Sequence, residues 1–265
     1  MADERNKNGV SLVLEHVGTA AYRMVEELGN VFVLFLQCVN GLVRPPSEFR
    51  NIMKQMEEVG IRSLPVVLVT AAFTGMVLAL QSWSGFQRFQ ATHFVGSVVA
   101  LSITRELGPV FAGLMVSGRV GAAMAAELGT MKVTEQIDAL VTLATNPVKY
   151  LVLPRVIAAT AVLPVLVIFA DLVGILGGYF VAVYLLGANP YLYVNKTYQY
   201  LTFNDIYTGL IKAAVFGFLI ALISCYNGFN AEGGAQGVGR ATTRAVVASS
   251  MAVLISDYFM TSFMF

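Results

Sequence analysis

Long apolar stretches separated by shorter polar ones dominate the pattern of this chain. No residue from 63 to 87 is charged, and an apolar run of that length is long enough for a helix that crosses a lipid bilayer. Similar stretches recur along the chain and predict five spans, at about residues 64–82, 94–126, 151–186, 206–226 and 245–263. The fold class that we expect is therefore an all-α, polytopic membrane protein.

The first 62 residues follow a different pattern and form a unit of their own, ahead of a transmembrane unit at residues 63–265. Between residues 12 and 43 polar and apolar positions mix at helical spacing, and the largely apolar run at 31–39 is short. A spanning helix needs about 20 apolar residues. We therefore expect an amphipathic helix that lies along the cytoplasmic membrane surface; a poor transmembrane helix is the alternative. A second amphipathic piece follows at residues 47–61.

The segment Glu127–Pro147 lies between the second and third predicted spans and is too polar to cross a bilayer. Thr134 is placed to cap a helix whose first turn carries Glu135 and Asp138, where carboxylates favour the helix dipole. Apolar residues then recur at helical spacing until Asn146-Pro147 ends the helix, which predicts roughly 18 Å of helix at 1.5 Å per residue. Such a helix suits a groove on a soluble partner; a solvated connector lying on lipid is the alternative.

Two further segments are expected to be loops. Residues 188–205 carry several tyrosines, which suit a membrane interface, and residues 227–244 are rich in glycine. The glycine-rich segment faintly resembles a phosphate-binding loop, but Arg240 stands where that motif has lysine, Ala241 follows it, and no strand precedes it. We therefore expect a flexible cytoplasmic turn there, and no ATP-hydrolysing apparatus in this chain.

Composition excludes several classes of protein. The chain is 57% hydrophobic and 12% charged, whereas soluble domains are roughly 25% charged, and its net charge of +1 gives no argument for a nucleic-acid partner. Cys38 and Cys225 lie in apolar surroundings, which predicts buried thiols rather than a disulfide framework. His16 and His93 have no neighbouring ligands at metal spacing. We expect no metal site, no catalytic residue and no enzyme.

The placement of lysine and arginine predicts the topology. Basic residues concentrate before the first span, around Glu127–Pro147 and in the glycine-rich segment, whereas Arg88 and Lys196 fall on the other side. The positive-inside rule therefore places the N-terminus, Glu127–Pro147 and the glycine-rich segment in the cytoplasm. Five spans then place the C-terminus outside.

Three charged residues inside apolar sequence, Arg105, Glu106 and Lys212, all fall toward the outer side of their predicted spans. Charges inside a membrane normally face a protein interior or a wet cavity. If the three cluster, they offer a cationic spot for the phosphate of an anionic amphiphile, whose acyl chains would lie against Leu78, Phe86 and Phe89. An Arg–Glu pair that only holds helices together is the alternative, and the sequence leaves the two open.

Four segments closely resemble the MlaE-type permease family. They are GMVLALQ at Gly75–Gln81, ALSITRELGPVFAGLMVSGRVGAAMAAELGTMKVTEQIDAL at Ala100–Leu140, NPVKYLVLPR at Asn146–Arg155, and GVGRATTRAVVASSMAVLISDYF near the C-terminus. The resemblance covers about residues 65–265. It implies a transmembrane permease domain with five spans, an N-terminal interfacial helix, and a cytoplasmic coupling helix between the second and third spans.

The resemblance also implies a function and partners. The chain would be a permease subunit of an ABC transporter that moves phospholipids between the inner and outer membranes of Gram-negative bacteria. It would form a homodimer with two cytoplasmic ATPase subunits, a periplasmic ring of MCE-domain proteins and often a small STAS-domain protein. ATP and Mg would belong to the ATPase, so this chain would hold no cofactor. The chain would lie in the bacterial inner membrane, with its N-terminus cytoplasmic and its C-terminus periplasmic.

Site residues follow from matching the family's motifs position by position. The coupling helix corresponds to Glu127–Leu143, and the residues that we expect to contact the ATPase are Glu127, Glu135, Ile137, Asp138 and Leu140. The family's lipid pocket lies between two permeases and opens outward. Matching gives this pocket Leu78, Arg105, Glu106 and Lys212, with Phe86 and Phe89 in a less similar segment.

Two readings from other classes stay open beside this one. An ion-coupled secondary transporter would use Asp171, Lys212 and Asp257 as carriers and would need no ATPase, but the internal repeats typical of such proteins are not visible. A non-transporting membrane scaffold would show no nucleotide-dependent change in bound lipid.

Overall fold

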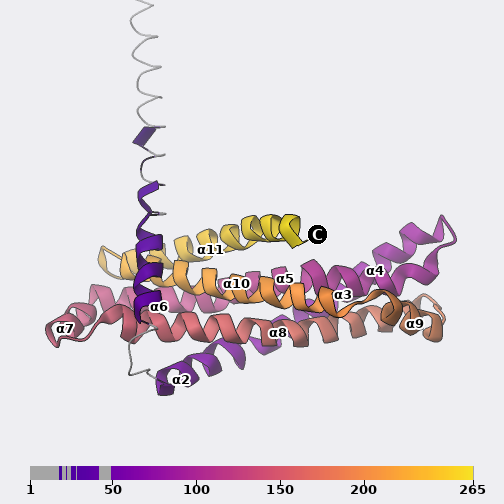
Figure 1. Ribbon diagram of the computed structural model, residues 1–265, viewed down its shortest axis with the longest axis horizontal. Coiled ribbons are helices and arrows are strands. Elements are labelled where there is room, and N and C mark those ends of the chain that lie inside the picture. The colour runs from indigo at the N-terminus through magenta and orange to yellow at the C-terminus, as the bar shows by residue number, and fades with distance from the viewer. Residues whose placement is uncertain (1–17, 20–21, 23–24, 28, 42–48, 265) are drawn as a thin grey trace, which may run out of the picture.

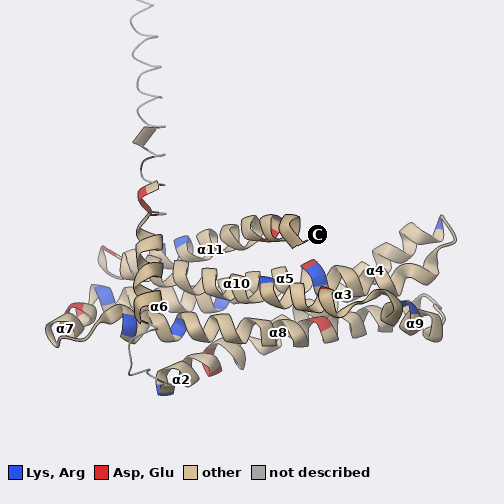
Figure 2. Cartoon of the chain, viewed as in Figure 1, with Lys and Arg blue, Asp and Glu red and all other residues tan. Residues whose placement is uncertain are grey.

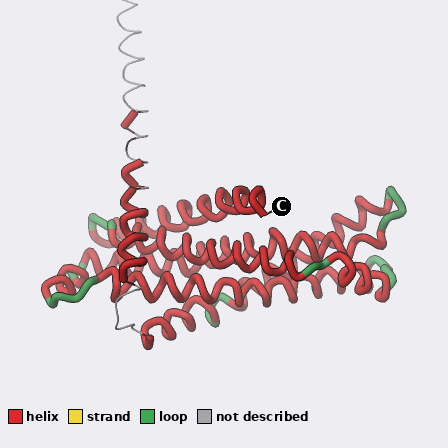
Figure 3. The backbone as a smooth tube through the Cα atoms, in the orientation of Figure 1, coloured by secondary structure: helices red, strands yellow, loops and turns green. Residues whose placement is uncertain are grey.

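The structure is a computed structural model that describes residues 18–19, 22, 25–27, 29–41 and 49–264. Long helices lie side by side in a bundle, and no strand occurs in this part of the chain (Figures 1 and 3). Five helical stretches are long and apolar enough to span a membrane, which confirms the five predicted spans. They are Phe49–Gln87, Thr92–Val133, Val148–Leu185, Phe203–Phe229 and Gly234–Met264, called spans one to five below.

Span two is a continuous rod with two π-helical turns. After the short 3-10 turn Thr92–Phe94, α4 (Val95–Ser102) runs through the π turn Ile103–Leu107 into α5 (Gly108–Val116), and the π turn Ser117–Gly121 leads into α6 (Ala122–Val133). Span three is built likewise: Val148–Val152 is π-helical, α8 covers Leu153–Phe180, and Val181–Leu185 is again π-helical. Such turns insert one residue into the helical ladder and are common at functional sites.

Small residues let the spans approach closely, as is typical of helices packed in a membrane. A Cβ atom on Gly75 of α3 (Leu64–Gln87) would lie 1.9 Å from the carbonyl oxygen of Gly174 in α8. A Cβ atom on Gly217 of α10 (Phe203–Phe229) would lie 2.4 Å from the carbonyl oxygen of Ala159. The centre of the bundle is therefore formed by α8 and α10, with buried Phe216 between them and span two.

The helix at residues 29–41 lies across one end of the bundle (Figure 1). Leu34 and Cys38 are buried in the main core, and the ring of Phe35 meets that of Phe218 edge-on at 5.4 Å. Burial raises the pKa of the Cys38 thiol to about 11, so this thiol is uncharged at neutral pH. The side of the helix opposite Leu34 and Cys38 exposes four apolar residues: Phe32, Val33, Leu36 and Val39. The predicted start of this helix, residues 12–17, lies outside the described residues.

The second N-terminal piece is α2 (Phe49–Gly60), which packs against α8 and is joined to α3 by a turn at residues 61–63. Its charged residues lie at the same end of the bundle as those around α7 (Gln136–Thr142), as Figure 2 shows. Few charged residues lie along the middle of the spans, as the apolar pattern predicts for helices in contact with lipid.

Both segments that were expected to be loops are largely helical. Residues 190–200 form α9 (Pro190–Tyr200), which begins because the side chain of Asn189 accepts hydrogen bonds from the backbone of Tyr191 and Leu192. Most of the glycine-rich segment belongs to α11 (Gly234–Met264), so the flexible turn predicted at residues 227–244 is wrong. Only residues 230–233 connect α10 to α11.

Candidate functional site

A buried lysine organises the charged site inside the membrane. Lys212 of α10 is fully buried, and its Nζ lies 2.6 Å from Oε2 of Glu106 in span two and 3.1 Å from Oδ1 of Asp257 in α11. The same ammonium donates hydrogen bonds to Thr261 Oγ1 at 2.7 Å and to the backbone carbonyl of Arg105 at 3.1 Å. A buried charge is costly unless it is paired and hydrogen-bonded, and here spans two and five supply the partners.

Arg105 forms a second ion pair beside the first. Its Nε donates to Oδ1 of Asp205 at 2.7 Å, and its second guanidinium nitrogen lies 2.6 Å from the same oxygen. Oδ2 of Asp205 accepts from the backbone N–H and the hydroxyl of Thr202, both at 2.8 Å, which closes a capping box at the start of α10. The Asp205 side chain is 1% exposed and that of Arg105 is 37% exposed. The buried carboxylate therefore fixes the orientation of a partly exposed guanidinium.

The structure brings Arg105, Glu106 and Lys212 together, as the pocket hypothesis required. It also adds residues that sequence reasoning missed or assigned elsewhere. Asp205 could have been found from the Thr202-x-x-Asp205 spacing of a capping box, and Asp257 was assigned only to the ion-coupled alternative. Thr261 gave no signal. The ammonium of Lys212 is fully buried and is paired with two carboxylates. Among the described residues, Arg105 is therefore the one cation of this cluster whose side chain is substantially exposed.

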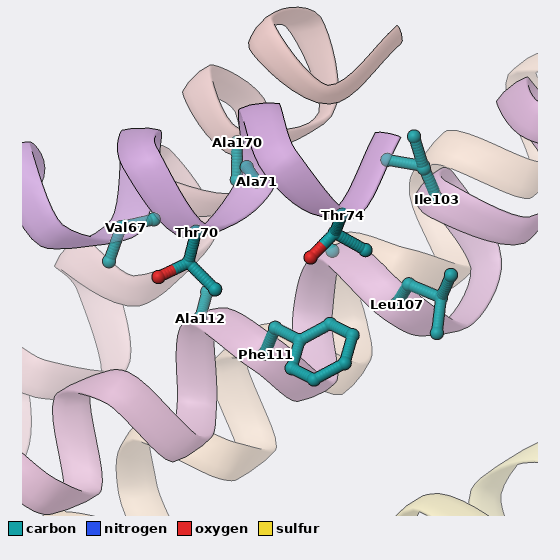
Figure 4. A pocket seen from close by; sticks show the side chains of 10 residues that line it. Val67, Thr70, Ala71, Thr74, Ile103, Leu107, Phe111, Ala112 and Ala170 are labelled. Carbon is teal, nitrogen blue, oxygen red and sulfur yellow. The ribbon is translucent and has the colours of Figure 1, made fainter. Parts of the chain in front are cut away.

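An apolar crevice lies on the other side of the same π turn. Ile103 and Leu107, which flank Arg105 and Glu106, line it together with Phe111 of α5 (Figure 4). The facing wall is α3, with the hydroxyl-bearing side chains of Thr70 and Thr74 at its edge. The crevice is narrow, because its walls leave only about 10 Å³ of free space between them. The π turn therefore presents charged groups on one side and aliphatic groups on the other, within five residues.

The predicted aromatic and aliphatic wall is only partly built from Leu78, Phe86 and Phe89. Leu78 and Phe86 are half-buried and pack against a second core cluster, which includes Val99 and Ile103 of span two. Phe89 lies beyond the end of α3 and is 79% exposed. Leu78 and Phe86 therefore adjoin the π turn through Ile103, whereas Phe89 faces away from the core.

The connector between spans two and three is helical, but it is shorter and begins later than predicted. α6 continues to Val133, Glu135 adopts a left-handed conformation with φ 60°, and α7 covers only Gln136–Thr142. Seven residues make roughly 10 Å of helix, not 18 Å. The Thr134 hydroxyl donates back to the carbonyl of Thr130 instead of capping α7.

Asn146-Pro147 also has a role opposite to the one predicted. The Asn146 side chain accepts hydrogen bonds from the backbone N–H groups of Val148 and Lys149, at 3.0 and 3.3 Å. It therefore caps the start of span three rather than ending α7, which stops at Thr142.

The residues proposed to contact a partner are divided between two faces. Ile137 is buried in the main core and Leu140 packs against it, so these two hold α7 to the bundle. Asp138 is exposed and pairs with Lys132 at 3.1 Å, Glu127 pairs with Arg155 at 2.7 Å, and Glu135 is exposed. The outward face adds two apolar residues that were not chosen, Val141 at 57% and Leu143 at 74% exposure.

Comparison with known proteins identifies the chain's relatives. The family described as Permease MlaE matches residues 52–263. A probable ABC transporter permease of Rickettsia bellii is 51% identical over 253 residues, 96% of this chain and 98% of that protein. A probable ABC transporter permease of Synechocystis is 41% identical over 265 residues, covering 100% and 97% of the two chains. The chloroplastic protein trigalactosyldiacylglycerol 1 of Arabidopsis thaliana is 39% identical over 236 residues, 89% of this chain and 67% of that one.

These relatives cover nearly the whole chain, and most carry the name of a transport component rather than of an enzyme. Together with five apolar spans they make the chain a multi-pass membrane protein. The chain belongs to the MlaE permease family of ABC transporters.

Proposed function

We propose that this chain is the permease of an ATP-driven phospholipid transporter, and that it holds the lipid beside the π turn Ile103–Leu107. The observation that carries the proposal is the two-sided character of this turn. Arg105, with 37% of its side chain exposed, offers a cation for a phosphate, and Ile103 and Leu107 offer apolar side chains at a narrow crevice, against which an acyl chain would lie.

The identity of the cargo is supported by a relative. The Arabidopsis protein is named after trigalactosyldiacylglycerol, a glycerolipid, and a glycerolipid shares with phospholipids two acyl chains on a polar headgroup. The guanidinium of Arg105 favours an anionic headgroup over a neutral sugar. We therefore propose a phospholipid as the substrate of this chain, moved between the inner and outer membranes.

The energy source is proposed to be a cytoplasmic ABC ATPase that docks on α7. The name ABC transporter permease implies ATPase partners, and α7 with the residue that follows it exposes Asp138, Val141 and Leu143. An apolar residue between polar ones is a usual anchor for a groove on a partner. ATP and Mg then belong to the partner, and this chain holds no cofactor.

A second copy of the chain is proposed to face α11. The buried residues of α11 form one stripe at four-residue spacing, ending at Val253, whereas Met251, Leu254, Ile255 and Phe259 are exposed. A span held by so narrow a stripe leaves most of its surface for lipid or for a partner copy. A homodimer in the bacterial inner membrane, with an outward-open cavity beneath a ring of MCE-domain proteins and with a STAS-domain protein on the ATPase, follows from the family resemblance.

Photocrosslinking tests the lipid site. A photoreactive residue placed at Leu107 should capture phospholipid in the purified complex, and the capture should fall when ATP is added. The same residue at Leu176, which is 63% exposed on α8, meets only surrounding lipid and should show no ATP dependence. Equal, ATP-independent capture at both positions would contradict a lipid site at the π turn.

A further inference from the structure

The connector α7 lies at the tip of a helical hairpin (Figure 1). One leg is α6, which runs outward to α7, and the other is the π-helical turn Val148–Val152 with the start of α8, which returns into the bundle. Both legs pack against α10, but they make little direct contact with each other. Any force applied at α7 could therefore move the two legs separately, unless something joins them.

A single ion pair joins the two legs below the tip. The second guanidinium nitrogen of Arg155 in α8 lies 2.7 Å from Oε2 of Glu127 in α6. The other terminal nitrogen donates to the backbone carbonyl of Leu151 at 2.6 Å. One planar guanidinium thus bridges α6 and the first turn of span three, a geometry that lysine cannot reproduce because it has one ammonium rather than a rigid fork.

The burial of this pair is unequal. The Arg155 side chain is 4% exposed, whereas that of Glu127 is 59% exposed, and Nε of Arg155 has no hydrogen-bond partner within the described part of the chain. A buried charge is costly when some of its hydrogen-bond donors have no partner. An arginine whose role was stability alone would therefore have a partner for each of its nitrogens. The helix at residues 29–41 approaches the same leg, since a Cβ atom on Gly41 would lie 3.5 Å from Leu153.

We propose that Arg155 is a positioning residue that makes the hairpin move as one body, so that a displacement of α7 reaches spans two and three together. The inference rests on the proposed docking of an ATPase on α7 and assigns Glu127 an internal role in place of a direct contact with that partner. Span two carries the π turn beside the lipid site, and span three supplies Ala170 to the crevice wall. The crevice residues of spans two and three therefore respond to the same motion, relative to the facing wall on α3.

The test uses the permease co-expressed with its ABC ATPase, purified and reconstituted in nanodiscs of phosphatidylethanolamine and phosphatidylglycerol. Three quantities are measured: recovery of the ATPase, the rate of ATP hydrolysis, and the change in bound phospholipid when ATP is added. The variants are Arg155→Met, Arg155→Lys and Glu127→Gln. Matched controls are Arg62→Met and Glu58→Gln, which break an exposed pair of 2.6 Å outside the hairpin.

We expect Arg155→Met to retain the ATPase and its hydrolysis, because the Glu127 left behind is exposed to water. The ATP-dependent change in bound lipid should fall by at least about fivefold, the lower end of ordinary coupling between sites. Glu127→Gln should give the same loss, Arg155→Lys a smaller one, and both controls none.

Two results overturn the inference while the proposed function stands. One is a full lipid response in Arg155→Met, and the other is a parallel loss of ATPase recovery, which would make Arg155 a folding or docking residue. A wild-type complex that recovers no ATPase, or that shows no lipid response to ATP, would instead overturn the proposed function.

Discussion

Lys212 and Glu106 lie 106 positions apart in the chain, and their charged atoms are 2.6 Å apart in the structure. This contact joins spans two and four inside the bundle, and Asp257 extends it to span five. Three of the five spans are therefore held in register by a single buried ammonium. The consequences of this arrangement can be measured one residue at a time.

Removing the ammonium should destabilise the bundle. Lys212→Met leaves Glu106 and Asp257 facing each other without a cation, and breaking a buried pair typically costs about 3–5 kcal/mol. We expect the lower end of this range, because Glu106 and Asp257 are partly exposed. Thermal unfolding in detergent measures the effect. The triple variant Lys212→Met, Glu106→Gln, Asp257→Asn should recover much of the stability, and a single Lys212→Met variant as stable as wild type would contradict the role of the cluster.

The second prediction concerns the exposed cation. Arg105→Gln removes the guanidinium that we propose for the lipid phosphate, and should lower co-purified phospholipid by about tenfold or more, because a hydrogen bond to a charged group contributes about 1.5–3 kcal/mol and about 1.4 kcal/mol corresponds to tenfold. Mass spectrometry of extracted lipid gives the count per permease. Lys196→Gln is the control, because Lys196 is a cation of α9 that lies near the rings of Phe94 and Tyr200. Equal loss in the two variants would argue for a diffuse electrostatic effect.

A third prediction tests the close approach of α3 and α8. Gly75→Ala places a Cβ atom 1.9 Å from the backbone oxygen of Gly174, so the helices must separate, and we expect a loss of about 1–3 kcal/mol. Gly118→Ala is the matched change, since nothing lies within 4 Å of its Cβ position. That variant should be neutral or stabilised by up to about 1 kcal/mol. Similar stability of the two variants would show that the spans are not packed this tightly.

The two faces of α7 should respond differently to substitution. Leu143→Asp changes a residue that is 74% exposed, so it should weaken ATPase co-purification without changing the melting temperature of the isolated permease. Ile137→Ala truncates a side chain that is 4% exposed and should cost about 2–5 kcal/mol of stability through the cavity that it leaves. ATPase recovery and thermal unfolding are compared for both. If Leu143→Asp retains the ATPase in full, docking does not use this face.

The spans were predictable because apolar length is a property that the sequence carries directly, whereas their ends were not. Residues 190–200 looked like a loop because of their polarity, yet Asn189-Pro190 is a standard start of a helix, and the same dipeptide at Asn146-Pro147 was interpreted as a stop. Asn-Pro is compatible with either role. The choice depends on whether the asparagine side chain meets backbone N–H groups that follow it, as it does at both positions.

The glycine-rich segment shows how composition misleads inside a packed protein. Glycine predicts flexibility when it is judged alone, but Gly237 lies in α11 where a Cβ atom would be 1.7 Å from the carbonyl oxygen of Glu232. Gly233 has a φ of +87°, which suits the tight turn before the helix. These glycines serve close packing and a sharp turn, a distinction that depends on the neighbouring backbone.

The candidate site was predictable in its charged residues and not in its geometry. Charges within apolar runs are costly and are therefore conspicuous, which singled out Arg105, Glu106 and Lys212. The π turn that separates charged from apolar side chains leaves no mark in the residue pattern, so the crevice formed by Leu107 and Phe111 was missed. The packing of α7 against the bundle was missed for a related reason. In the sequence, Ile137 belongs to an apolar helix face, and such a face can contact the bundle or a partner equally well.

The most direct test of the account is the number of phospholipids bound per permease in the purified complex with its ATPase, measured with and without ATP. The account predicts bound phospholipid without nucleotide and a clear change in its amount when ATP is added, with both lost in Arg105→Gln. A phospholipid count that ATP leaves unchanged, in a complex that hydrolyses ATP, would contradict the claim that this permease transports lipid.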